Sequence, residues 1–97
     1  MKKHNKNILE YKKELVKVFF KAGNGQEMAD FLIDILTPRE FEALALRWQI
    51  VKKLNQGETH RQIAGELGIG VSTVTRGSRE LRNNKGGFTQ ILRKLRK

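Results

Sequence analysis

The sequence predicts an all-α fold of six helices, and three observations support this prediction. Apolar residues recur three and four positions apart, and no segment shows the alternation of a β-strand. Most of the nine glycines fall between these apolar runs. Threonine or serine residues suited to capping precede three of the runs. The length of 97 residues predicts one small helical domain over residues 7–97, preceded by a flexible basic arm over residues 1–6.

The helices are expected in an order that the breaks along the chain define. They are expected over residues 7–22, 26–36, about 38–55, two short helices within 59–82, and about 88–96. Thr37, Pro38 and Glu40 supply an N-cap, a first-turn proline and a capping-box glutamate for the long helix, which Gly57 ends. The first helix is amphipathic, and its inward face is expected to hold Ile8, Tyr11, Leu15, Val18 and Phe19.

The segment 59–82 predicts a helix-turn-helix unit. Thr59 and Gln62 form a capping box, and Gly68 and Gly70 permit the tight turn that ends the first helix. Ser72 or Thr73 is expected to cap the second helix, and the inward residues of the pair are Ile63, Leu67, Val74 and Leu81. The residues left facing outward are Ser72, Thr73, Thr75, Arg76, Arg79 and Arg82. Hydroxyl and guanidinium groups on one helix face favour DNA recognition. The alternative is a helical hairpin with a solvated basic face.

The formal net charge of +10 is concentrated at the two ends of the chain. Residues 1–21 have seven basic and two acidic residues, residues 22–56 have four and five, and residues 57–97 have nine and three. This distribution favours a near-neutral dimer core flanked by surfaces that meet a polyanion. Three alternatives stay open: a charge that only maintains solubility, a nucleoid-type DNA binder that uses charge alone, and a membrane-surface role for the first helix.

Composition argues against several other classes of protein. The absence of cysteine excludes disulfides, thiol catalysts and thiolate metal sites. No apolar run approaches the roughly 20 residues of a membrane span, and a signal peptide is not expected, so we expect a cytoplasmic location without a membrane partner. The histidines, His4 and His60, have no nucleophile or paired acid within an evident motif, so we expect neither an enzyme nor a metal site. His60 is interpreted as a surface or phosphate contact.

Two residues occupy unusual positions for their type. Arg47 interrupts an apolar stripe of the long helix that includes Leu44 and Val51, so its guanidinium needs an anion or a flat partner. Gly77 lies inside the second helix of the pair, where glycine costs about 1 kcal/mol relative to alanine. A gap at Gly77 beside Arg76 would suit a flat ligand carrying a carboxylate. The alternatives are an ordinary ion pair or a solvated head for Arg47, and close helix packing at Gly77.

Four segments together resemble the bacterial tryptophan repressor family. They are L-T-P-R-E at 36–40, A-L-A-L-R at 43–47, Q-G-E-T-H-R-Q-I at 56–63 and V-T-R-G-S at 74–78. The resemblance covers about residues 28–82. It implies a six-helix, intertwined homodimer that represses transcription at double-stranded operator DNA when L-tryptophan is bound as corepressor. It implies no other cofactor.

The resemblance also implies a set of ligand-binding residues. The indole would lie between Arg47 and Arg76, and Arg76 would also bind the carboxylate. Backbone carbonyls just before Thr37, from the partner subunit, would face the ammonium. The implied set is Leu36, Thr37, Arg47, Arg76, Gly77 and Glu80. A serine of the family is Glu80 here, which can pair with the ligand's ammonium or bond Arg76 or Arg79 and close the pocket.

A second set of residues is implied for DNA. The family's direct guanine contact matches Arg61, and its water-mediated and phosphate contacts match residues on the second helix. With Arg79, which faces outward on that helix, the DNA-binding set is Arg61, Val71, Ser72, Thr73, Thr75, Arg79 and Arg82. Arg79 replaces an asparagine of the family and Ala64 replaces a lysine, so a different operator sequence is expected. A ligand-independent or differently liganded regulator of the same fold is the alternative.

Overall fold

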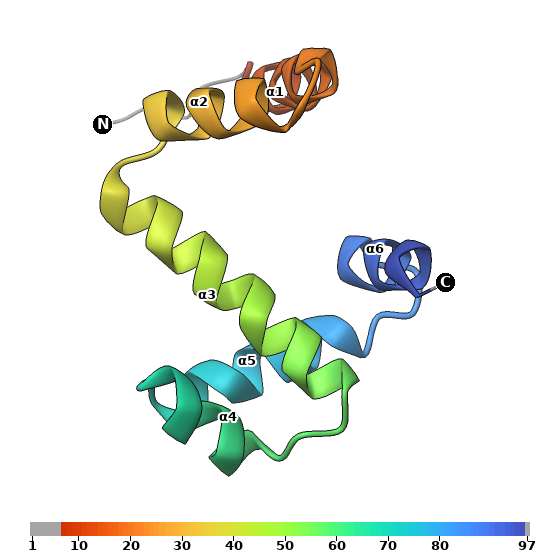
Figure 1. Cartoon of the computed structure of the whole chain (residues 1–97). Coiled ribbons are helices and arrows are strands. Elements are labelled where there is room, and N and C mark those ends of the chain that lie inside the picture. The colour runs from red at the N-terminus through yellow and green to blue at the C-terminus, as the bar shows by residue number, and fades with distance from the viewer. Residues whose placement is uncertain (1–6, 97) are drawn as a thin grey trace, which may run out of the picture. The chain divides into compact units, whose positions relative to one another are not determined.

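The computed structural model describes residues 7–96, and these form six helices and no strand (Figure 1). In chain order they are α1 (Ile8–Lys21), α2 (Gly25–Ile35), α3 (Pro38–Asn55), α4 (His60–Leu67), α5 (Val71–Leu81) and α6 (Gly87–Leu95). The all-α prediction and the order of the six helices are confirmed. The predicted basic arm, 1–6, lies outside the described residues. The chain divides into two compact units, Met1–Phe41 and Glu42–Lys97, and one domain over residues 7–97 stays a prediction.

Capping boxes begin two of the helices, as the sequence predicts. The Glu40 amide donates to Thr37 Oγ1 at 3.1 Å, and the Thr37 amide donates to Glu40 Oε1 at 2.9 Å. The same reciprocal pair joins Thr59 and Gln62, at 3.1 and 2.9 Å. Each box satisfies two groups that a helix start leaves without partners. These local bonds fix where α3 and α4 begin.

The start of α5 differs from the prediction. Gly70, in ordinary extended backbone, is the N-cap residue, and no side chain caps the helix, so Ser72 and Thr73 lie within the first turn. The cause is the tightness of the preceding turn. Gly68 adopts the left-handed conformation at φ 69°, and the Ile69 amide already donates to the Ala64 carbonyl at 3.0 Å. The chain therefore re-enters a helix earlier than the polar side chains suggest.

The buried core of the second unit lies where α3, α4 and α5 meet (Figure 1). Ile63 and Val74 have no exposed surface, and Ile50 is only 2% exposed. The core cluster comprises Ile50, Ile63, Ala64 and Val74, with Leu54, Leu67 and Ile69 packed against it. Burial of the predicted inward residues Ile63 and Val74 is confirmed. This core holds α5 against α3, which positions the site described below.

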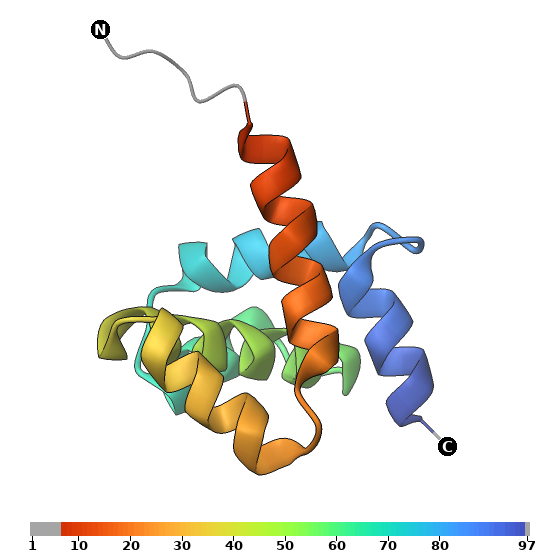
Figure 2. The same cartoon turned by 90° about the horizontal axis from the view of Figure 1, so that it is seen from above.

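In the first unit, α1 and α2 pack through one aromatic pair, and Figure 2 shows them diverging from the turn that joins them. The rings of Phe19 and Phe31 meet edge to face, with centroids 5.5 Å apart. Neither α1, α2 nor α6 contains a buried residue in the described part of the chain. The predicted inward face of α1 is therefore exposed within a single chain, at 37% for Phe19 and 50% for Tyr11. In addition, no helix among residues 7–96 has the length and apolarity needed to cross a membrane.

A three-residue charge cluster ties the end of α3 to α4. Lys53 Nζ lies 2.8 Å from Glu66 Oε1 and 3.8 Å from Glu58 Oε2. The hydrogen bond to Glu66 raises the pKa of Lys53 above its usual value, and the same bond lowers the pKa of Glu66 below its usual 4.5. A depressed carboxyl pKa stabilises the fold above pH 4.5 and loses that effect as pH falls through the folded-state pKa. The raised lysine pKa extends the effect up to and beyond pH 10.5.

Glu66→Gln is expected to lower the urea midpoint of unfolding at pH 7 and to have a smaller effect at pH 3. At pH 7 the variant lacks the carboxylate that Lys53 binds, whereas below pH 4.5 the stabilisation that the wild-type carboxylate supplies declines as the pH falls. Urea titrations of both proteins at the two pH values, at one protein concentration, measure the difference. An equal loss at both pH values would show that packing, and not charge, explains the role of Glu66.

Candidate functional site

Helix α5 has two distinct faces besides its buried one, because its remaining residues fall into two helical stripes. Thr73, Arg76, Gly77 and Glu80 recur at spacings of three and four and therefore share one face. A second stripe faces away from it and consists of Val71, Ser72, Thr75, Arg79 and Arg82. Val74, between the two, is fully buried in the core. One short helix thus serves an inner cavity and an outer surface.

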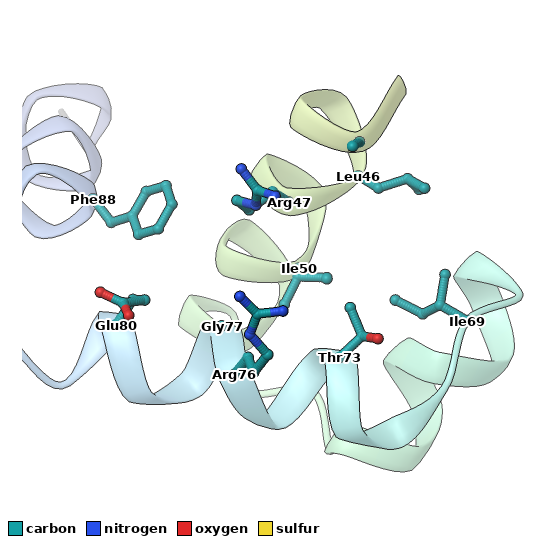
Figure 3. Close-up of a pocket in the computed structure, with 10 residues that line it drawn as sticks. Leu46, Arg47, Ile50, Ile69, Thr73, Arg76, Gly77, Glu80 and Phe88 are labelled. Carbon is teal, nitrogen blue, oxygen red and sulfur yellow. The ribbon is translucent and has the colours of Figure 1, made fainter. Parts of the chain in front are cut away.

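The first face of α5 lines a cavity in the second unit, with a volume of about 230 Å³ (Figure 3). Helix α3 supplies four of the lining residues, also spaced three and four apart, and α6 supplies Phe88. The lining residues are Ala43, Leu46, Arg47, Ile50, Ile69, Thr73, Arg76, Gly77, Glu80 and Phe88. Apolar walls with a few charged groups are typical of a site for a small organic ligand.

Two guanidinium groups enter this cavity from different helices. Arg47 comes from α3 and Arg76 from α5, and Figure 3 shows both side chains directed into the same space. Neither arginine forms an ion pair with any described residue. The ordinary ion pair considered for Arg47 is therefore not observed within residues 7–96. Planar guanidinium faces accept aromatic rings, and their edges bind carboxylates in pairs of hydrogen bonds.

Gly77 is buried because α5 approaches α3 closely at this point. A β-carbon built on Gly77 would lie 2.7 Å from Ile50 Cγ2, nearer than real contacts allow. Close helix packing, the alternative considered for this glycine, is therefore present. Gly77 also lines the cavity, so the missing side chain serves both the packing of the two helices and the shape of the cavity.

Phe88 is a cavity residue that the sequence analysis did not identify. Its position depends on the turn between α5 and α6, which α6 side chains hold by hydrogen bonds. Thr89 Oγ1 donates to the Asn83 carbonyl at 3.0 Å, and Gln90 Nε2 donates to the Lys85 carbonyl at 3.0 Å. Figure 3 shows Phe88 near Glu80 at one end of the cavity. In the sequence, Phe88 is one apolar residue among several on α6, so no local signal distinguishes it.

Two other ligand residues implied by the resemblance are not in the lining of this cavity. Leu36 caps the end of α2, and Thr37 forms the capping box of α3. Both belong to the first unit, and neither is among the residues that line the cavity. Of the implied ligand set, the structure brings together Arg47, Arg76, Gly77 and Glu80.

The second face of α5 is exposed, together with part of α4. Val71 is 48% exposed, and Arg61, Ser72, Arg79 and Arg82 are exposed as well. Thr75 is half-buried: its hydroxyl donates to the Val71 carbonyl at 3.1 Å and lies 3.4 Å from His60 Nδ1. Thr73, also implied as a DNA contact, is exposed and lines the cavity. The exposed surface therefore presents three arginines and the hydroxyl group of Ser72 beside the apolar Val71.

Comparison with protein families matches residues 10–96 to the family described as Trp repressor protein. This chain belongs to the Trp repressor family. This chain is 45% identical over 73 residues to a Trp operon repressor homolog of Vibrio cholerae, and the match covers 69% of this chain and 71% of that protein. It is 42% identical over 78 residues to a Trp operon repressor homolog of Vibrio vulnificus, covering 74% and 76%. No solved structure matches this Trp repressor family chain. The resemblance predicted from the sequence is confirmed.

Proposed function

We propose that this chain is a homodimeric transcriptional repressor whose binding to operator DNA requires L-tryptophan in the cavity between α3 and α5. The observation that supports this proposal is that two guanidinium groups without ion-pair partners, those of Arg47 and Arg76, lie between apolar walls in one cavity. One side of that cavity is the inner face of α5, and the outer face of α5 is exposed and basic. An occupant of the cavity contacts the helix that would contact DNA. This arrangement connects the state of the ligand site directly to the DNA-binding surface.

The chemistry of the cavity suits an aromatic amino acid. The indole ring would stack on the faces of Arg47 and Arg76, where cation–π attraction adds to apolar burial. The carboxylate would receive two hydrogen bonds from Arg76. We further propose that the partner subunit's Leu36 and Thr37 complete the site, as the family resemblance implies.

Dimer formation is supported by the apolar surface that a single chain leaves exposed. Exposed large apolar residues occur on α1, α2 and α6, including Phe20 at 85% and Leu95 at 66%. Apolar side chains that stay exposed along one helix, as they do along α1, mark an interaction site. A second copy of the chain would cover it, and a twofold pair of α5 helices would match a palindromic operator whose half-sites are about 34–36 Å apart.

Tryptophan would act by favouring one position of α5. Without ligand, the cavity beside Gly77 would leave the side of α5 that carries Arg76 and Glu80 without a packing partner, so the spacing of α5 from the partner's helix would vary. With ligand bound, the spacing that fits two successive major grooves is populated more strongly. The ligand therefore raises operator affinity through its preference for the DNA-ready state, and DNA must raise ligand affinity by the same factor.

Calorimetric titration of the isolated protein with L-tryptophan tests the ligand assignment. We expect one molecule to bind per chain, and we expect Arg79→Ala, on the outer face of α5, to bind L-tryptophan with unchanged affinity. A protein that binds operator DNA but takes up no L-tryptophan would be a ligand-independent regulator. Equal affinity for operator and random DNA at moderate salt would indicate a nucleoid-type binder that uses the +10 charge alone.

Arg61→Ala is expected to relax base preference more than it weakens binding to random DNA. Arg61 is exposed at the start of α4, and an arginine that bonds guanine contributes about 1–3 kcal/mol of discrimination. Titrations of the variant with operator DNA and with a guanine-substituted operator measure this preference. Equal losses on every sequence would instead identify Arg61 as a phosphate contact.

A further inference from the structure

Among residues 7–96, Glu80 is the only one lining the cavity that carries a carboxylate, and it follows Arg76 by one helical turn. It forms no ion pair with any described residue, although Arg76 and Arg79 are its neighbours on α5. Helix geometry explains this, because a basic residue placed four positions before an acidic one gives the weaker orientation of such a pair. The structure thus shows an available carboxylate at the cavity wall.

The charged groups of the cavity suit a ligand that carries both a negative and a positive charge. Arg47 and Arg76 supply two positive groups, and Glu80 supplies one negative group at the end of the cavity that it shares with Phe88 (Figure 3). A carboxylate ligand without an amino group would bind Arg76 but would add a second negative charge near Glu80. A zwitterionic amino acid would place its carboxylate at Arg76 and its ammonium at Glu80, so that each charge of the ligand meets an opposite charge. Hydrogen bonds between charged groups are the stronger kind, and Glu80 is positioned to accept one.

We propose that the Glu80 carboxylate makes a free ammonium group a condition for tight binding, so that the cavity selects the amino acid over its deaminated analogue. This inference rests on the proposed function and assigns the specificity of the same site. Glu80 is a specificity-determining residue, and Arg47 and Arg76 bind ring and carboxylate regardless of the amino group. Because Glu80 is exposed, solvent screening moderates its effect.

Calorimetry with three related ligands tests this proposal on the full chain. L-tryptophan carries both charged groups, indole-3-propionate lacks the ammonium, and tryptamine lacks the carboxylate. The wild-type protein is expected to bind L-tryptophan at least about tenfold more tightly than indole-3-propionate. Glu80→Gln is expected to weaken the binding of L-tryptophan and of tryptamine by about tenfold. The same variant is expected to bind indole-3-propionate with unchanged or higher affinity.

Two further variants separate charge from shape. Glu80→Asp keeps the charge and is expected to keep the preference for L-tryptophan. Glu42→Gln changes the net charge by the same amount as Glu80→Gln, but Glu42 is an exposed α3 residue that does not line the cavity. We expect it to leave the affinity for all three ligands unchanged. An unchanged preference in Glu80→Gln would overturn the proposal. Tighter binding of all three ligands to Glu80→Gln would also overturn it, because Glu80 would then be competing for Arg76. If the wild-type protein binds no L-tryptophan, the proposed function fails, and this inference fails with it.

Discussion

Arg76→Ala is expected to remove the dependence of operator binding on L-tryptophan. In the proposed site, Arg76 both stacks on the indole and bonds the carboxylate, and hydrogen bonds to charged groups contribute about 1.5–3 kcal/mol. Loss of that interaction lowers ligand affinity by roughly 10- to 150-fold. Gel-shift titrations of operator DNA with and without L-tryptophan measure the effect. Binding to random DNA should change little, because Arg76 belongs to the cavity face of α5.

Arg79→Ala is the matched control for this experiment. It removes the same type of side chain from the same helix, but from the outer face. We expect it to weaken DNA binding and to preserve the response to L-tryptophan. An Arg76→Ala protein that still responds fully to L-tryptophan would remove Arg76 from the ligand site.

Gly77→Ala is expected to lower the free energy of unfolding by up to about 2 kcal/mol, although alanine is the better helix former by about 1 kcal/mol. The added methyl group would lie 2.7 Å from Ile50 Cγ2. Ile50 is β-branched and 2% exposed, so its γ-methyl cannot move without disturbing the core. The overpacking cost, about 1–3 kcal/mol, therefore exceeds the gain in helix propensity.

Gly65→Ala is expected to have the opposite effect on the free energy of unfolding of the same protein. Gly65 lies inside α4 with nothing within 4 Å of its added β-carbon. Alanine should therefore stabilise the protein by up to about 1 kcal/mol. Urea unfolding at one protein concentration measures both changes, since the stability of the proposed dimer would depend on concentration. If both alanine variants stabilise the protein, the close contact between α3 and α5 is not a constraint on Gly77.

The sequence predicted the helices well because local bonds determine most of their ends. The capping boxes at Thr37 and Thr59 need only residues three positions apart, and Gly68 takes up the left-handed conformation expected of it. The start of α5 could not be predicted in the same way. A backbone bond from Ile69 to Ala64 completes the turn, and no side chain indicates it.

The site was predicted unevenly for a similar reason. Arg47 and Arg76 were identified because each interrupts a helical pattern or adjoins a glycine, and the structure directs both into one cavity. Phe88 was missed because its place depends on how the α5–α6 turn directs α6 toward the cavity. The sequence did not indicate that Thr73 lines the cavity, since Thr73 has the same chemistry as its neighbour Ser72, which does not.

In the proposed mechanism, occupancy of the cavity controls DNA binding by the outer face of α5. Titration of palindromic operator DNA with the protein, at zero and at saturating L-tryptophan and at one salt concentration, tests it most directly. We predict that L-tryptophan tightens operator binding by roughly 5- to 150-fold and leaves binding to random DNA unchanged. Equal operator affinity with and without L-tryptophan would contradict the account.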